Sequence, residues 1–415
     1  MRLLRPLTNR DFALLITGTL ISMIGDGIYL VAITYATLSL SPGPGALSIV
    51  GGAMATGLLL FVVLGGVLAD RHNKRHVLML SDVVRFLALV AVAATAFGGT
   101  LHVWQLVVLS FLYGAGEGLG APAMGSVVPE ILDGERLVAG NALAGSLRPI
   151  AQRFVGPAVG GVVVALAGTR GAFAIDAGTF LVSIACLAAM RGHQPRLEAV
   201  HDPLKLQLAE AARFVRAHTW LWATLLMAAL AVLCFFGPTE VLVPVLIKDE
   251  FRQGASAYGA VLAAIGLGSV LGTFVIGQRG IPAREILVLY GVWAAATLGL
   301  CGYAISHAAW QVALFGFAFG IGEGIGGVIW ATLMQVRVPE RLRGRVSSLD
   351  WLLSLALMPV SFVVTAPIAE LIGVRETLLL AGLLASAATA GVYLALPRLR
   401  AENGGLARAN AQPGA

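Results

Sequence analysis

The sequence predicts an all-α membrane protein with twelve transmembrane helices. Of its 415 residues, 58% are hydrophobic and 12% are charged, and its mean hydropathy is +0.86. A soluble domain carries about 25% charged residues, so this chain has more apolar surface than a water-soluble core would bury. Its apolar runs reach about 20 residues, which is long enough to cross a bilayer as a helix. The sequence lacks the alternating segments of about 10 residues that build a transmembrane barrel.

Each apolar run is bounded by charged residues or by a turn rich in Gly and Pro. In chain order, the predicted spans are residues 11–40, 45–69, 76–98, 102–129, 139–167, 170–191, 219–247, 254–278, 285–306, 309–335, 346–373 and 375–396. The first run is too long for the core of a signal peptide, so we expect it to be retained as a span. A polar, partly amphipathic connection separates six spans from six. We therefore predict an N-terminal half (1–191), a cytoplasmic linker (192–218), a C-terminal half (219–396) and a cytoplasmic tail (397–415).

The charges of the connections predict the orientation in the membrane. Most of the 28 Lys and Arg residues lie in the N-terminus, the even-numbered connections and the tail. The odd-numbered connections hold Arg170, Lys248, Arg252 and Arg375. Because basic loops stay on the cytoplasmic side, both termini are predicted to be cytoplasmic, which agrees with an even number of spans. The basic pI of 9.5 is explained in the same way and does not indicate a nucleic-acid partner.

A segment around a glutamate occurs twice. WQLVVLSFLYGAGEGLG (104–120) aligns with WQVALFGFAFGIGEGIG (310–326), and Trp, Gln, Phe, Glu and four Gly coincide. The same offset places GVLADRHNK (66–74) on GTFVIGQRG (272–280). The two halves are therefore predicted to be parallel six-helix repeats. In transporters built this way, the substrate site lies near mid-membrane where the repeats meet.

The predicted connection between spans 2 and 3 carries a recognisable motif. GVLADRHNKRHVL (66–78) resembles the signature of the major facilitator superfamily, through Gly66, Asp70, Arg71, Lys74 and Arg75. Asn73 replaces a glycine of the signature, but Asn also tolerates the left-handed turn that Gly would supply. The resemblance implies the major facilitator fold and a conformational switch loop at these residues. At the aligned position of the second copy, Ile276 stands in place of Asp70. The second copy therefore lacks this carboxylate, and we expect its switch loop to be weaker.

Span 5 carries a second motif. QRFVGPAVGG (152–161) resembles the antiporter signature of the superfamily through Gly156, Pro157, Gly160 and Gly161, while Gln152 stands where the signature has Gly. Pro kinks a helix and Gly permits close helix contact. Phrases such as SMIGDGIYLVAI also resemble the branch that contains macrolide and siderophore exporters. These resemblances imply an exporter, and a solute importer on the same fold is the alternative.

Charged residues inside predicted spans are candidate functional residues, because burying charge in a membrane is costly. A carboxyl group in a low-dielectric cavity resists losing its proton and can exchange one near neutral pH. The candidates for proton coupling or substrate binding are Asp26, Glu117, Glu323, Glu240, Arg148 and Arg153. Either arginine could neutralise Glu117 or bind an anionic substrate. Asp82 and Arg85 are three residues apart in span 3, and we interpret them as a local ion pair.

The function that these observations favour is secondary efflux of hydrophobic or amphipathic small molecules, of the multidrug-resistance type, in exchange for protons by alternating access. A non-transporting receptor or assembly factor is a further alternative. The sequence has no phosphate-binding loop, no H-E-x-x-H and no Cys/His cluster, so we predict no enzyme, no cofactor and no metal. The expected partners are the lipid bilayer, a small-molecule substrate and protons, with the chain acting as a monomer. Composition favours a bacterial inner membrane.

Overall fold

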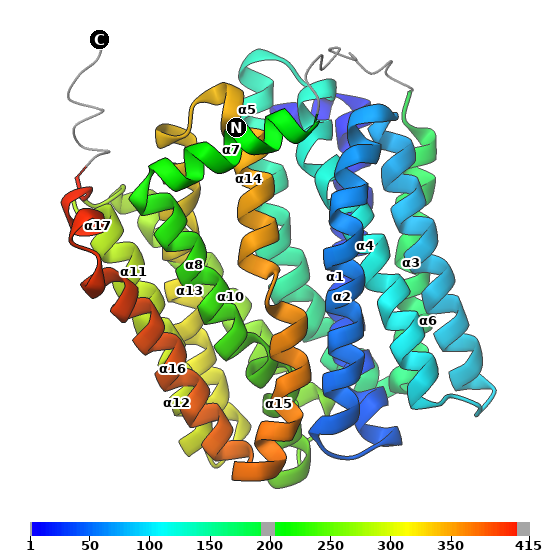
Figure 1. The fold of residues 1–415 in the computed structure, drawn as a ribbon. Helices are drawn as coiled ribbons and strands as arrows, with labels where there is room; N and C mark the ends of the chain where they lie inside the picture. The colour runs from blue at the N-terminus through cyan, green and yellow to red at the C-terminus, as the bar shows by residue number, and fades with distance from the viewer. Residues whose placement is uncertain (1, 192–203, 405–415) are drawn as a thin grey trace, which may run out of the picture. The chain divides into compact units, whose positions relative to one another are not determined.

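The computed structural model describes residues 2–191 and 204–404, and the described residues are helical throughout apart from turns. The first half of the predicted linker and the last residues of the predicted tail lie outside this part of the chain. Eleven of the described helical stretches are long and apolar enough to cross a membrane. Figure 1 shows the helices as a ribbon.

The helices of the first six predicted spans follow one another with short turns. They are η1 (Arg2–Thr8), α1 (Arg10–Leu40), α2 (Pro44–Arg71), α3 (Lys74–Phe97), α4 (Val103–Ile131), α5 (Gly134–Leu147), η2 (Arg148–Val155) and α6 (Gly156–Ala189). Their starts have local causes. The side chain of Asn9 accepts hydrogen bonds from the first backbone N–H groups of α1, and Pro44 occupies the first turn of α2, where its missing N–H costs nothing.

The remaining helices are broken more often. They are α7 (Leu204–Ala217), α8 (Thr219–Gly237), η3 (Pro238–Leu242), α9 (Val243–Val245), η4 (Leu246–Glu250), α10 (Ala255–Arg279), α11 (Glu285–Thr297), α12 (Gly299–Ile305), α13 (Ala309–Arg337), α14 (Glu340–Leu355), α15 (Met358–Ile372), α16 (Val374–Ala395) and α17 (Pro397–Ala401). The elements η2, η3 and η4 are π-helical.

One helical stretch contains two of the predicted spans, which is why eleven stretches correspond to twelve predictions. It runs over Ala139–Ala189, and its 51 residues are far more than the roughly 20 that one crossing requires. The stretch is interrupted at Gly168, whose φ of 71° and ψ of 175° leave the helical region. A side chain there would be strained, so Gly marks the break between the predicted spans 139–167 and 170–191.

The chain forms two compact units. Unit 1 comprises residues 1–199 with 244–263, and unit 2 comprises 200–243 with 264–415. In unit 1, α2 packs along α4, α1 along α6, and α3 against both α4 and α6 (Figure 1). The predicted division into two six-helix halves and a linker stays a prediction.

The glycines of the repeated segment explain how α4 and α13 pack. A Cβ at Gly114 or Gly118 would collide with backbone carbonyls of α2, and one at Gly320 or Gly324 would collide with carbonyls of α10. The other two glycines of each copy face a different neighbour, which is α3 for α4 and α11 for α13. Small residues that let backbones approach are typical of membrane helix packing. The glycines of each copy therefore admit two neighbouring helices.

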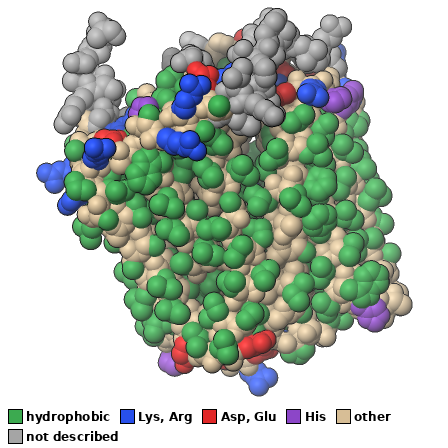
Figure 2. All heavy atoms as spheres, viewed as in Figure 1, with side chains coloured by type: hydrophobic (Ala, Val, Ile, Leu, Met, Phe, Trp, Pro, Cys, Tyr) green, Lys and Arg blue, Asp and Glu red, His purple; other side chains and the backbone are tan. Residues whose placement is uncertain are grey.

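The outer surface is apolar along the helices. On the face shown in Figure 2, hydrophobic side chains cover most of the helix length, and Lys, Arg, Asp and Glu lie near helix ends. Leu166 and Leu371 are each 84% exposed. Exposed apolar surface of this extent is stable in the lipid of a membrane. In water, the same surface would cause the protein to aggregate.

Candidate functional site

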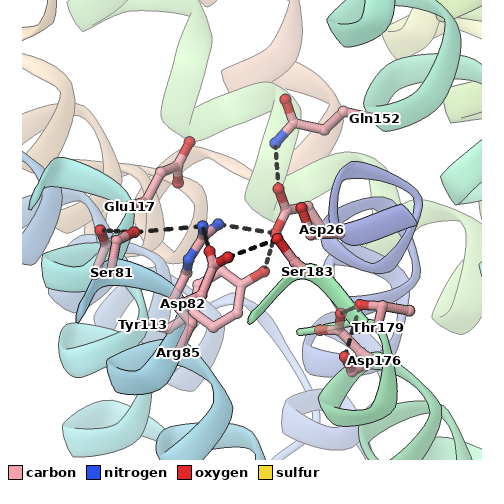
Figure 3. A network of polar contacts seen from close by, with 12 residues as sticks. Asp26, Ser81, Asp82, Arg85, Tyr113, Glu117, Gln152, Asp176, Thr179 and Ser183 are labelled. Carbon is pink, nitrogen blue, oxygen red and sulfur yellow. Dashed lines mark hydrogen bonds and ion pairs between the residues drawn. The ribbon is translucent and has the colours of Figure 1, made fainter. Parts of the chain in front are cut away.

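A network of charged and polar side chains lies within unit 1, and Asp26 is at its centre (Figure 3). Asp26 Oδ1 is 3.3 Å from Arg85 Nη1 and accepts a hydrogen bond of 2.5 Å from the hydroxyl of Tyr113. The three residues come from α1, α3 and α4. The side chains of Asp26 and Arg85 are 10% and 12% exposed. The network therefore joins three helices through a largely buried ion pair.

Arg85 has a second carboxylate. Its Nη2 is 2.7 Å from Oδ1 of Asp82, and Ser183 of α6 donates a 2.6 Å hydrogen bond to the other oxygen of Asp82. The guanidinium also lies 4.4 Å from the ring centre of Phe180. Our interpretation of Asp82 and Arg85 as a local ion pair was therefore incomplete. The pair exists, but Arg85 also contacts Asp26 of α1, because its long side chain reaches beyond its own helix.

Gly116 makes room for this arginine. A Cβ at Gly116 would lie 2.6 Å from Cγ of Arg85. Gly120, one turn further along α4, faces Ser81 of α3, whose hydroxyl donates to the carbonyl of Gly116 at 2.7 Å. The glycines on either side of Glu117 thus bring α3 close enough to place Arg85 between Asp82 and Asp26.

Tyr113 is fixed by aromatic packing. Its ring stacks on Tyr29 with centroids 3.9 Å apart, and the hydroxyl of Tyr29 is 3.0 Å from that of Ser110. Both tyrosines are buried. Stacking and burial restrict the ring, so the hydroxyl of Tyr113 stays directed at Asp26. No sequence pattern singled out Tyr113, because a tyrosine in an apolar run is usually a packing residue.

Glu117 and Arg148 form the second part of the network. Arg148 Nη2 is 3.1 Å from Glu117 Oε1, and Arg148 Nε donates to Gln152 Oε1 at 2.8 Å. Gln152 Nε2 in turn donates to Oδ2 of Asp26 at 3.4 Å. Arg148 is 41% exposed and Glu117 is 17% exposed. Of the two arginines of span 5, Arg148 lies at ion-pair distance from Glu117, and Arg153 is exposed on the same element.

The π-helical element η2 positions Arg148 and Gln152. Pro157 follows it, and proline lacks an N–H and displaces the carbonyl four residues earlier, so the regular helical register is interrupted. A wider π-helical turn is a common response, and such turns are frequent at functional sites. Gln152 was missed as a site residue, although its departure from the glycine of the antiporter signature was a signal.

Asp176 lies near this network on α6 but is held differently. It is fully buried, and its Oδ1 accepts a 3.1 Å hydrogen bond from Thr179. Its Oδ2 has no hydrogen-bond partner among the described residues. A Cβ at Gly25 of α1 would collide with this carboxyl group, so α1 and α6 approach closely here.

Two of the candidates, Glu323 and Glu240, lie on separate elements of unit 2, and Asp350 is a further carboxylate there. Glu323 is half-buried on α13, and Glu240 is half-buried on η3. Asp350 of α14 accepts hydrogen bonds from Trp330 Nε1 at 3.0 Å and from Ser354 at 3.1 Å. In the part of the chain that the structure describes, no three His, Cys, Asp or Glu side chains are grouped so that they could hold a metal ion.

The residues of the predicted switch loop connect the ends of helices in unit 1. Gly66 lies in α2, and Asp70 and Arg71 are exposed at its end. Lys74 forms an ion pair with Glu130 of α4. Arg75 donates hydrogen bonds of 2.7 Å to the carbonyls of Ala188, at the end of α6, and Met190, just after it.

Asn73 does not use the left-handed turn that it could tolerate. Its φ is −60°, and its side chain accepts a hydrogen bond from the backbone N–H of Arg75. Asn73 therefore acts as the N-cap of α3, a position for which its short polar side chain is well suited.

The glycines of the span 5 motif form close contacts. A Cβ at Gly156 would lie 2.7 Å from the carbonyl of Ile24, and one at Gly160 would lie 2.8 Å from Cα of Ile28. A Cβ at Gly161 would lie 3.0 Å from the carbonyl of Ala255, at the start of α10. Pro157 packs against Gly27 of α1. The motif thus places η2 and its side chains beside Asp26.

A helical membrane protein with a charged network buried among its spans has the construction of a transporter, and comparisons with known proteins agree. The solved structure of a bacterial homologue of the iron transporter ferroportin, in its inward-facing state, matches with a TM-score of 0.69. The match covers 92% of this chain and 98% of that one at 19% identity. The predicted major facilitator fold is confirmed.

The sequence comparisons define the family. Residues 2–413 match the transmembrane secretion effector family, and the chain belongs to that family. It is 30% identical over 410 residues to the multidrug efflux pump Tap of Mycobacterium tuberculosis, with 95% of each chain covered. It is 24% identical over 379 residues to the macrolide efflux protein A of Streptococcus pyogenes, covering 88% of this chain and 91% of that one. The chain is a multi-pass membrane transporter of the efflux type and not an enzyme.

Proposed function

We propose that this chain exports hydrophobic or amphipathic small molecules from a bacterial cell in exchange for protons, by alternating access. It acts as a monomer in the inner membrane with both termini in the cytoplasm. The efflux pumps that are similar to it along most of their length support the direction of transport. The observation that carries the proton exchange is the position of Asp26 among Arg85, Tyr113 and Gln152.

Asp26 is suited to bind and release a proton because its cation is shared. Arg85 contacts both Asp26 and Asp82. When Asp26 takes up a proton, it loses its charge and its ion pair, but Arg85 keeps Asp82. A buried arginine left without any partner would be strongly destabilising, and this arrangement avoids that state. Protonation of Asp26 therefore changes the charge of the site at a limited energetic cost.

The pair of Glu117 and Arg148 supports a role in substrate contact. Arg148 is the most exposed of the charged residues that form ion pairs in the network. Its guanidinium can donate to a substrate oxygen, and Glu117 can accept from a cationic group. The pair is therefore compatible with amphipathic compounds that carry polar groups of either kind.

Proton exchange is tested in proteoliposomes loaded with a pH-sensitive dye. A proton gradient is imposed, and lipophilic cations, macrolides and siderophores are added in turn to the native protein and to the variants Asp26→Asn and Glu117→Gln. The matched control is Glu370→Gln, which removes an exposed carboxylate of α15. We expect substrate-dependent proton flux in the native protein and the control, and its loss in Asp26→Asn. Substrate binding without proton flux in the native protein would refute the exchange.

A further inference from the structure

Gln152 lies between the two halves of the network. It is the position at which the chain departs from the leading glycine of the antiporter signature, so its side chain is a property of this sequence. Its Nε2 donates to Oδ2 of Asp26 at 3.4 Å, and its Oε1 accepts from Arg148 Nε at 2.8 Å. The amide therefore contacts the carboxylate of Asp26 on one side and the guanidinium of Arg148 on the other.

Both charged partners select the same orientation of the amide. A carboxylate can only accept hydrogen bonds, and a guanidinium can only donate them. The amide nitrogen must then face Asp26 and the amide oxygen must face Arg148. The reversed orientation would place two donors together at Arg148 and two acceptors together at Asp26. The protonation state of Asp26 thus constrains the hydrogen bond between Gln152 and Arg148.

The two oxygens of Asp26 are not equivalent. Oδ1 accepts from both Arg85 and Tyr113, whereas the partner of Oδ2 among the described residues is Gln152. If Asp26 takes up a proton, Oδ2 is the oxygen that receives it, because Oδ1 already accepts from Arg85 and Tyr113. The new O–H is a donor and faces the amide N–H₂ of Gln152, which is also a donor. The amide relieves this conflict by turning, and its N–H₂ then faces the donor Nε of Arg148.

We propose that Gln152 is a positioning residue that links the protonation of Asp26 to the placement of Arg148, and through Arg148 to the binding of an amphipathic substrate that carries hydrogen-bond acceptors. This inference rests on the proposed function and assigns a residue and a substrate chemistry to it. When Asp26 is charged, Gln152 holds Arg148 in place to donate to a substrate oxygen. When Asp26 is protonated, that hold is lost. Proton and substrate therefore oppose each other, as exchange requires.

Other charged and titratable groups around Asp26 act on both states. They come from every element packed at this point: Tyr29 of α1, Asp82 and Arg85 of α3, Tyr113 and Glu117 of α4, Arg148 of η2, and Asp176 of α6. A substitution at Gln152 that carries no charge leaves all of these groups in place. It removes the amide link alone, which makes Gln152→Leu the informative variant.

The first measurement is the binding of radiolabelled erythromycin, an acceptor-rich macrolide, to the purified full chain from neutral to acidic pH. We expect affinity of the native protein to fall by about tenfold on acidification, within the usual range of coupling between two sites. In Gln152→Leu the affinity at neutral pH should already be about tenfold lower than in the native protein, because Arg148 is no longer held, and acidification should lower it further by less than about twofold. The ionisation of erythromycin itself is common to both proteins and cancels in the comparison.

Two controls distinguish loss of the Gln152 link between Asp26 and Arg148 from a general effect of substitution on binding. Tetraphenylphosphonium carries no hydrogen-bond acceptor, so the pH dependence of its binding should be the same in native protein and Gln152→Leu. Gln278→Leu removes an exposed glutamine of α10 and should behave as native. If Gln152→Leu does not fold, Gln152→Met keeps an unbranched side chain and is measured in the same way.

Infrared difference spectroscopy gives a readout that a merely structural role would not change. The carboxyl C=O band of protonated Asp26, assigned by its absence in Asp26→Asn, should shift in Gln152→Leu because its O–H loses the amide acceptor. An unchanged band together with an unchanged pH dependence of erythromycin binding would overturn the link. If Asp26→Asn keeps native proton flux, the proposed proton exchange itself fails, which is a different result.

Discussion

The two copies of the repeated segment have the same packing but different chemistry. In α4 and in α13, two glycines of the motif face one neighbouring helix and two face another. The polar residues around them differ. At the offset that aligns the copies, Asp82 and Arg85 of α3 correspond to Val288 and Gly291 of α11. Tyr113 of α4 corresponds to Phe319 of α13.

The difference shows which residues of the repeat maintain helix packing and which form the charged network. In unit 1, the space beside Gly116 is filled by Arg85, which pairs with Asp26 and Asp82. In unit 2, Phe319 instead packs with Phe235, with ring centres 5.6 Å apart. The backbone of the duplicated segment has therefore been retained, because a Cβ at the crossing points collides with backbone. The side chains between helices were free to diverge.

Removing the charge of Arg85, which has no counterpart in the second copy, should have the largest effect on stability and transport. Arg85→Leu leaves Asp26 and Asp82 without their cation, and loss of one partner of a buried pair costs about 3–5 kcal/mol. We expect a large fall in the thermal unfolding temperature and no transport. The control Arg279→Leu removes an exposed arginine at the end of α10 and should be close to native.

A compensated variant sharpens this test. Asp26→Asn, Asp82→Val and Arg85→Leu together make unit 1 resemble the apolar second copy. Much of the stability should return, because replacing a complete buried ion pair by uncharged side chains is often neutral. Transport should remain absent. A triple variant as unstable as Arg85→Leu would mean that Arg85 stabilises the fold by packing rather than by charge.

The packing that both copies share should respond equally in both. Gly114→Ala and Gly320→Ala each place a Cβ against a backbone carbonyl, of Met54 and of Ile265 respectively. Overpacking of this kind costs about 1–3 kcal/mol. Thermal unfolding of the two variants should show similar losses.

The matched controls for this prediction are Gly125→Ala in α4 and Gly327→Ala in α13. Nothing lies within 4 Å of a Cβ at either position. Both controls should be neutral or slightly stabilising, because Ala is the better helix former. A loss in one copy alone would show that the packing of the two copies is not equivalent.

The hydroxyl that distinguishes Tyr113 from Phe319 should have a smaller effect. Tyr113→Phe keeps the stacking on Tyr29 and removes the hydrogen bond to Asp26. We expect a loss of about 1.5–3 kcal/mol in stability, the range for a hydrogen bond to a charged group, and a partial loss of transport. Chemical unfolding and proteoliposome flux measure the two effects. Native flux in Tyr113→Phe would exclude the hydroxyl from the exchange.

The smallest effect is expected at the second glutamate. Glu323→Gln lies in a copy whose aligned α11 positions are Val288 and Gly291, so we expect transport to change by less than about threefold. Glu117→Gln removes the ion pair with Arg148 and should reduce transport more strongly. Flux assays of the two variants side by side provide the measurement. Equal losses would show that both glutamates take part in the same step.

Much of the fold and part of the site could be predicted from the sequence. Apolar runs predicted the spans, and the glycines of the span 5 motif indicated close helix contacts. Asp26, Glu117 and Arg148 could be selected because a charge inside a span is costly and needs a reason. Arg85 was placed in a local pair, since spacing along one helix reveals partners three or four residues away and nothing further. Tyr113 and Gln152 were missed, because their hydrogen bonds cross from one helix to another.

The sequence by itself determined the solvent, the span lengths and the glycine positions, since these depend on composition and on local periodicity. The tertiary structure decided which charges meet. Asp26 meets Arg85 because Gly116 admits α3 to α4, and it meets Gln152 because the motif glycines bring η2 beside α1. Such contacts join residues that are far apart in the chain, so they depend on how helices approach one another rather than on any local pattern.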